Sequence, residues 1–131
     1  MSRGYVYVLS NPAMPGLVKI GRTIHNPEDR ARQLDNTGVP MPFVLEFSCL
    51  SPNCHELEQW AHEHLDRNRV RLEREFFRVD AKEAALAIGD LLQEQVAELV
   101  EEYLPGCIVI SDSEHADLIE MAAQSPVRSH G

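Results

Sequence analysis

The runs Tyr5-Val6-Tyr7-Val8-Leu9 and Leu17-Val18-Lys19-Ile20-Gly21 decide the fold, because both are rich in β-branched, aromatic and other apolar residues. The segment between them contains Ser10-Asn11-Pro12 and Met14-Pro15-Gly16, which are turn-forming residues. Together they predict two short strands joined as a β-hairpin.

A helix is predicted immediately after the hairpin. Asn26 suits an N-cap, Pro27 the first helical position, and Glu28 and Asp29 the positive first turn. We expect this helix to run to about residue 36, with Gly38 at its end.

A third strand and a second helix follow. Phe43, Leu45, Phe47 and Cys49 alternate with Val44, Glu46 and Ser48, which is the period of a half-buried strand. Over residues 52–66, helical spacing puts a set of apolar residues on one face, namely Leu57, Trp60, Ala61 and Leu65.

The rest of the sequence predicts a short extended segment at residues 75–79 and then a long helix. Asp80 and Glu83 form a capping box, and Pro105-Gly106 ends the helix after Leu104. Its apolar residues recur at three- and four-residue spacing: Ala85, Ile88, Leu92, Val96, Leu99 and Tyr103. A strand at 107–110, a short helix at 114–123 and a tail at 124–131 complete the expected order.

Charge divides the 131 residues into two parts. The net charge is −9, yet residues 1–80 carry ten Lys and Arg against eleven Asp and Glu, whereas residues 81–131 carry two against ten. We therefore interpret residues 1–80 as a functional domain and residues 81–131 as an acidic helical extension. A net negative protein does not coat nucleic acid by bulk electrostatics, so a polyanion has to be met locally.

Composition also limits the compartment and the cysteine chemistry. No segment has the roughly 20 apolar residues of a membrane span or the pattern of a signal peptide, so we expect a cytoplasmic protein without membrane contact. The three cysteines, Cys49, Cys54 and Cys107, have no CxxC spacing, which argues against a disulfide framework and a four-ligand zinc site.

The order of motifs over residues 4–80 resembles the GIY-YIG nuclease superfamily. The matching pieces are Tyr5-Val6-Tyr7, Lys19-Ile20-Gly21-Arg22-Thr23, Arg30 in a helix, and Glu58 in a later helix. The resemblance is strongest to small bacterial and phage members with KIG in place of YIG. In that branch Asn-Pro-Glu-x-Arg follows KIGRT, here residues 26–30, and a Glu-Phe-Phe element, here residues 75–77, closes the domain.

This resemblance implies a small three-stranded antiparallel sheet flanked by helices, within the α+β class. It also implies metal-dependent hydrolysis of DNA phosphodiester bonds with Mg²⁺ or Mn²⁺. Cleavage is expected to be weakly sequence-selective, or directed by DNA structure or a partner. The alternative is a catalytically inactive nucleic-acid-binding or protein-interaction module on the same scaffold. Lys19, where most members have a second tyrosine, and the net charge favour that alternative.

The resemblance assigns roles to particular residues. Tyr7 positions or deprotonates the attacking water, Arg30 binds the phosphate and Glu58 binds the metal. Lys19 contacts phosphate or lowers the pKa of Tyr7, and His62 shares a helical face with Glu58 and orients it, touches phosphate or acts as an acid.

Further contacts and alternatives remain open. Phosphate contacts are expected from Arg22, Thr23 and Arg69. Arg69 belongs to a basic cluster with Arg67, Arg71 and Arg74. Glu75 is an additional candidate for the site. Shifts of register would exchange Tyr7 for Tyr5, Arg30 for Arg32 or Glu58 for Glu56. A zinc site formed by Cys54, His55, Glu58 and His62 is a weaker alternative. The long acidic helix covers the domain or binds a second copy or a protein partner.

Overall fold

The computed structural model describes residues 2–35, 41–70 and 75–106. The elements follow one another as β1 (Gly4–Ser10), β2 (Val18–Thr23), α1 (Pro27–Leu34), β3 (Val44–Ser51), α2 (Cys54–His64), a 3-10 turn (Asp66–Asn68), β4 (Phe76–Phe77) and α3 (Ala81–Tyr103). The α+β class predicted from the sequence is confirmed.

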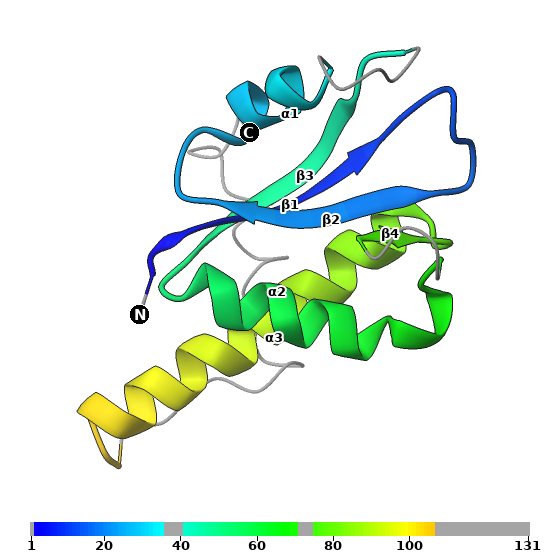
Figure 1. The fold of residues 1–131 in the computed structure, drawn as a ribbon. Coiled ribbons are helices and arrows are strands. Elements are labelled where there is room, and N and C mark those ends of the chain that lie inside the picture. The colour runs from blue at the N-terminus through cyan, green and yellow to red at the C-terminus, as the bar shows by residue number, and fades with distance from the viewer. Residues whose placement is uncertain (1, 36–40, 71–74, 107–131) are drawn as a thin grey trace, which may run out of the picture. The chain divides into compact units, whose positions relative to one another are not determined.

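The strands form one antiparallel sheet in the order β3-β1-β2-β4 (Figure 1). The predicted hairpin of β1 and β2 is confirmed, with Tyr7 opposite Gly21. The expected three-stranded sheet has a fourth, two-residue strand, because Phe76 and Phe77 pair with the beginning of β2.

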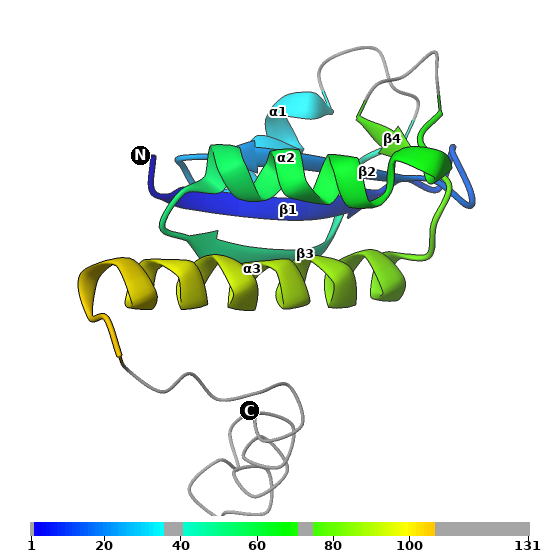
Figure 2. The ribbon, with the colours of Figure 1, turned by 90° about the horizontal axis from the view of Figure 1, so that it is seen from below.

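The two faces of the sheet are covered by different helices. One face buries Val6, Val8 and Ile20 against α2 and the first part of α3. The opposite face buries Tyr7 and Leu9 against α1. Figure 1 shows α1 on one side of the sheet, and Figure 2 shows α2 and α3 running across the other.

Helix starts follow the sequence signals. The Asn26 side chain accepts a hydrogen bond from the backbone amide of Glu28 at 2.7 Å, as expected of an N-cap. The predicted face of α2 is also confirmed in its main members, since Leu57, Ala61 and Leu65 are buried.

Strand β3 departs from the simple alternation. A bulge lies where Val8 pairs with Phe47 and Leu9 pairs with Leu45. The extra residue moves Leu45 to the α1 face, while Phe47 packs on the α2 face. Strand β3 therefore contributes apolar side chains to both faces of the sheet.

Helix α3 begins as predicted, but the residues that it buries differ from the predicted apolar set. Ala84, Ile88 and Gln95 are its buried residues, whereas Val96 is 44% and Tyr103 is 68% exposed. The polar Gln95 is buried on this face, where it is hydrogen-bonded to Ser51 and Asn53 at the β3–α2 connection.

The chain divides into two compact units, Met1–Val96 and Ala97–Gly131. The boundary expected after residue 80 falls just before α3, but α3 residues through Val96 belong to the unit that holds the sheet, because Ala84 and Ile88 complete its core. Three sets of predictions lie outside the described residues: the helix end at Gly38, the elements expected beyond residue 106, and Arg71 and Arg74. Within the described part of the chain, no helix has the length and apolar character required to cross a membrane.

Candidate active site

Polar side chains converge at the β2 edge of the sheet, in a pocket of about 250 Å³. Five residues line it: Tyr7, Arg22, Arg30, Glu58 and Glu75. Tyr7 lies on the α1 face and Arg30 on α1 itself, whereas Glu58 comes from α2 and Arg22 pairs with Val6 of the α2 face. The pocket therefore gathers side chains from both sides of the sheet around one strand.

Tyr7 reaches this edge because its cross-strand neighbour is a glycine. A Cβ added to Gly21 would lie 2.5 Å from the Tyr7 hydroxyl oxygen and 2.7 Å from Cζ. The phenol therefore lies directly over the Gly21 backbone, and Tyr7 is only 2% exposed. Tyr5, the alternative by register, pairs with Thr23 and does not line the pocket.

Arg30 is the cation in contact with Tyr7. Burial raises the pKa of Tyr7, while the hydrogen bond and the positive charge of Arg30 act in the opposite direction. Arginine only donates, so the Tyr7 oxygen accepts this bond and its own proton remains available to another acceptor. Arg32, the register alternative, forms an ion pair with Asp29 on the exposed side of α1.

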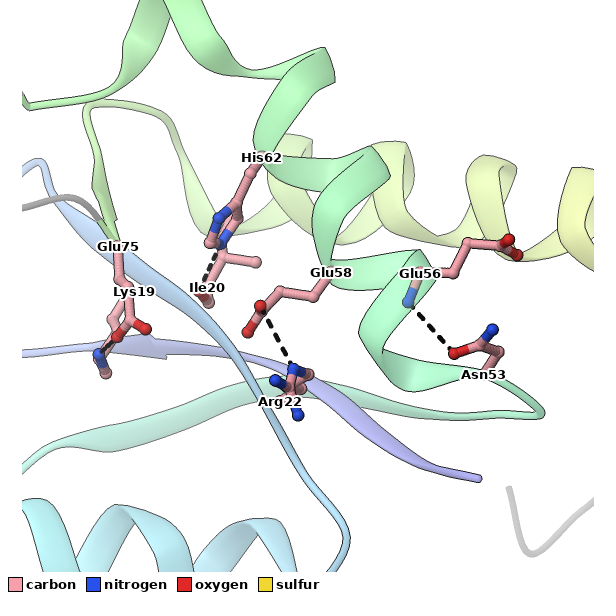
Figure 3. Close-up of polar contacts among 8 residues, drawn as sticks. All are labelled: Lys19, Ile20, Arg22, Asn53, Glu56, Glu58, His62 and Glu75. Carbon is pink, nitrogen blue, oxygen red and sulfur yellow. Dashed lines mark hydrogen bonds and ion pairs between the residues drawn. The ribbon is translucent and has the colours of Figure 1, made fainter. Parts of the chain in front are cut away.

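Glu58 points from α2 toward β2, where Arg22 Nε lies 3.5 Å from its Oε1 (Figure 3). Burial raises the pKa of the Glu58 carboxyl, and nearby Glu75 raises it further, whereas His62 and Arg22 lower it. The side chain is 16% exposed, compared with 41% for Arg22. Glu56, the alternative carboxylate, instead accepts a hydrogen bond from Gln95 at 2.9 Å.

His62 lies one turn after Glu58, but its ring is directed at the sheet. Nε2 lies 2.9 Å from the backbone oxygen of Ile20 (Figure 3). Since a carbonyl only accepts, Nε2 carries the proton, and the ring also packs 5.1 Å from Phe77. His62 therefore supports the edge of β2 and influences Glu58 by its charge, and it is not among the pocket-lining residues.

Lys19 lies on the Tyr7 face of β2 but forms an ion pair with Glu75. Its ammonium also lies 5.5 Å from the centre of the Phe76 ring. The sequence suggested that Lys19 lowers the pKa of Tyr7, whereas in the structure Arg30 supplies the opposing charge and the net shift is upward. Glu75, only a possible addition on sequence grounds, lines the pocket.

Two predicted phosphate-binding residues are not brought into the pocket. The Thr23 hydroxyl accepts a hydrogen bond from the backbone amide of His25 at 3.1 Å, which belongs to the turn after β2. Arg69 stacks 5.3 Å from the centre of the Phe77 ring and pairs with Asp66 at 3.7 Å. Arg22, the third of this group, does line the pocket.

Sequence reasoning missed one residue that supports the site from a distance. Gln95 of α3 donates to the Asn53 carbonyl and to Glu56, both at 2.9 Å, and accepts from the buried Ser51 hydroxyl at 2.6 Å. These bonds hold the first turn of α2, the helix that carries Glu58. A lone polar residue in an amphipathic helix gives no sequence signal that separates it from an exposed one.

The donor set is compatible with a hard divalent cation. Mg²⁺ is commonly held by one or two carboxylates, with water and substrate phosphate completing the shell. Glu58 offers such a carboxylate: burial raises its pKa, and its ion pair with Arg22 is 3.5 Å long and involves a guanidinium side chain that is 41% exposed. Across the described segments no group of three or more His, Cys, Asp and Glu side chains is arranged to hold a metal, which disfavours the zinc alternative.

Comparison with known proteins gives one match. No curated protein and no solved structure matches this chain. Residues 4–101 match the T5orf172 domain, a range that contains the whole sheet, the five pocket residues and nearly all of α3. The match covers most of the sequence, so the chain belongs to the T5orf172 domain family, which is GIY-YIG-like and nuclease-related.

Proposed function

We propose that the protein is a metal-dependent endonuclease that hydrolyses DNA phosphodiester bonds. The observation that carries the proposal is the convergence of Tyr7, Arg22, Arg30 and Glu58 on one pocket from four separate elements of the chain. Membership of a nuclease-related family supports the same reading. Two guanidiniums, a phenol and a carboxylate match the needs of phosphodiester cleavage, which are charge neutralisation and an activated water.

Each residue has a distinct task in this proposal. Arg30 and Arg22 bind non-bridging phosphate oxygens, because a planar guanidinium forms paired hydrogen bonds with phosphate. The Tyr7 oxygen is held by Arg30, so its proton can be donated to the phosphate or to the attacking water. Tyr7 thus acts in its neutral form, since burial raises its pKa.

Glu58 would hold Mg²⁺ or Mn²⁺. A bound divalent ion supplies Lewis-acid stabilisation of the phosphate and lowers the pKa of water. Arg22, which pairs with Glu58 at 3.5 Å and is 41% exposed, is then free to turn toward the phosphate.

A second candidate is DNA binding without cleavage. The Arg22–Glu58 ion pair favours it, because this pair satisfies the carboxylate that would otherwise bind metal. The two candidates make different predictions for the Glu58→Gln variant. An endonuclease loses metal-dependent cleavage, whereas a binding module keeps its DNA affinity and never cleaves.

The test measures nicking of supercoiled plasmid, single-stranded DNA and branched DNA with Mg²⁺ or Mn²⁺, in parallel with gel-shift binding. Glu58→Gln is compared with Glu63→Gln, which alters an exposed carboxylate on the same helix. We expect metal-dependent nicking by the wild type and Glu63→Gln and loss of nicking in Glu58→Gln. Inactivity of the wild type on all substrates, with a retained gel shift, would replace the endonuclease by the binding module.

A further inference from the structure

The pocket contains a carboxylate that the proposed roles leave unused. Of the five lining residues, Arg22 and Arg30 have no acceptor atom, and the Tyr7 oxygen already accepts from Arg30. Glu58 is assigned to the metal. Glu75 is the remaining acceptor that faces the substrate space.

Both the backbone and the side chain of Glu75 are fixed by contacts with β2. Its backbone oxygen accepts a hydrogen bond from the Ile20 amide at 3.0 Å, which ties it to the edge of β2. Its carboxylate receives the Lys19 ammonium. Lys19 is itself fixed, because its side chain is only 9% exposed and its ammonium lies against the Phe76 ring.

The carboxylate nevertheless remains accessible. The Glu75 side chain is 49% exposed and lines the pocket. Its negative charge acts on both Tyr7 and Glu58, so it lies close to the residues that would hold phosphate and metal. In Figure 3 the Lys19–Glu75 and Arg22–Glu58 pairs follow one another along β2, which separates the two carboxylates.

The counter-ions suggest different uses for the two carboxylates. Lys19 is buried and directly bonded to Glu75, whereas Arg22 is more exposed and 3.5 Å from Glu58. The fixed Lys19 ammonium therefore repels a divalent cation at Glu75 more strongly than the Arg22 guanidinium repels one at Glu58.

Resting on the proposed nuclease function, we propose that Glu75 is a further catalytic carboxylate, which binds the attacking water and accepts its proton, and that Lys19 is the residue that positions it. The water oxygen forms a bond to phosphorus as one water proton passes to Glu75. The bond from phosphorus to the leaving sugar oxygen breaks, and that oxygen takes the electron pair and a proton from solvent. Glu75 returns its proton to solvent after each turnover.

The experiment compares Glu75→Gln with Glu58→Gln and Glu63→Gln by three measurements. These are single-turnover cleavage with saturating Mg²⁺, DNA affinity in Ca²⁺, and Mn²⁺ binding by calorimetry without DNA. We expect Glu75→Gln to cleave at least 100-fold more slowly, while its Mn²⁺ and DNA affinities stay within about threefold of the wild type, as losses of general-base catalysis are about 100- to 10,000-fold. Retained Mn²⁺ binding also shows that the variant is folded.

Several outcomes would overturn the inference. Wild-type cleavage by Glu75→Gln refutes the role of Glu75 and leaves the nuclease proposal intact. Loss of Mn²⁺ binding in Glu75→Gln makes Glu75 a metal ligand instead of the base. Absence of cleavage by the wild type refutes both proposals together.

Lys19 is tested separately because it acts through Glu75. We expect Lys19→Met to lower the single-turnover rate about tenfold without changing the DNA concentration that gives half-maximal rate, and Lys19→Arg to restore most of the loss. A merely structural lysine would change stability, and the rate would not recover in the arginine variant. Equal rates for the wild type and Lys19→Met would refute the positioning role.

Discussion

Replacing Gly21 by alanine tests the central contact of the site. The new Cβ would lie 2.5 Å from the Tyr7 hydroxyl oxygen, 2.7 Å from Cζ and 3.0 Å from Cε1, all atoms of one rigid ring. Ordinary contact begins at 3.4 Å, so the ring has to retreat by about 0.9 Å, the difference between 3.4 and 2.5 Å. Tyr7 is 2% exposed and packs in a buried cluster with Leu9 and Ala31, which restricts the movement of its ring.

Two losses follow from that displacement. Overpacking of a buried site costs about 1–3 kcal/mol of unfolding free energy, which exceeds the gain from a less flexible unfolded chain. Moving the phenol by about 1 Å also disturbs its bond to Arg30, and a misplacement of that size lowers a catalytic rate about 100-fold. We therefore expect Gly21→Ala to be less stable and nearly inactive.

The assay combines urea unfolding with plasmid nicking, and Gly89→Ala is the matched control. Nothing lies within 4 Å of a Cβ added at Gly89, which is exposed on α3. There alanine improves helix propensity by about 1 kcal/mol, so the control is expected to be more stable. If Gly21→Ala unfolds within about 0.5 kcal/mol of the wild type and nicks DNA normally, Tyr7 does not lie over Gly21 as described.

Three further predictions concern other parts of the same unit. Gln95→Ala leaves the buried Ser51 hydroxyl and the Asn53 carbonyl without this partner, so we expect a loss of about 2–4 kcal/mol in urea unfolding, against less than about 0.5 for Gln93→Ala. Arg30→Ala removes the guanidinium beside Tyr7 and is expected to slow nicking at least 100-fold, whereas Arg32→Ala on the exposed side of α1 leaves the rate unchanged; equal rates would refute the placement of Arg30. Burial raises the pKa of Cys49 to about 11 from 9.0, so at pH 8 its alkylation, mapped by mass spectrometry, should be about 100-fold slower in the folded protein than in urea. Because the folded-state value is the higher one, the stability that Cys49 contributes is present below about pH 9 and is lost as the pH rises toward 11.

Local signals in the sequence predicted much of the fold. The N-cap at Asn26, the β1–β2 hairpin and the buried face of α2 all depend on residues within a few positions of one another. Such short-range patterns report backbone preference and burial directly. The motif resemblance likewise predicted four of the five pocket residues, and Glu75 was considered as an addition.

Features that depend on distant partners could not be predicted in the same way. The bulge in β3 is visible only when Phe47 and Leu45 are aligned with β1. The buried face of α3 includes Gln95, whose partners lie about 40 residues earlier in the chain. The partner of Lys19 was also missed, because Glu75 is separated from it by 56 positions.

The Lys19–Glu75 pair bears on the departure from the superfamily pattern. A lysine whose side chain is 9% exposed requires a counter-charge, because burying an unpaired ammonium is strongly unfavourable. Glu75 supplies that charge from the element that pairs with β2 at the same point, so the lysine and the Glu-Phe-Phe element form one structural unit. If Lys19 occupies the position of the second tyrosine, as the motif resemblance implies, this position brings a carboxylate to the pocket instead of a second hydroxyl. With Arg22 and Arg30, Lys19 raises the local positive charge to three against two carboxylates, which is the local charge that the proposed binding of DNA by a protein of net charge −9 requires.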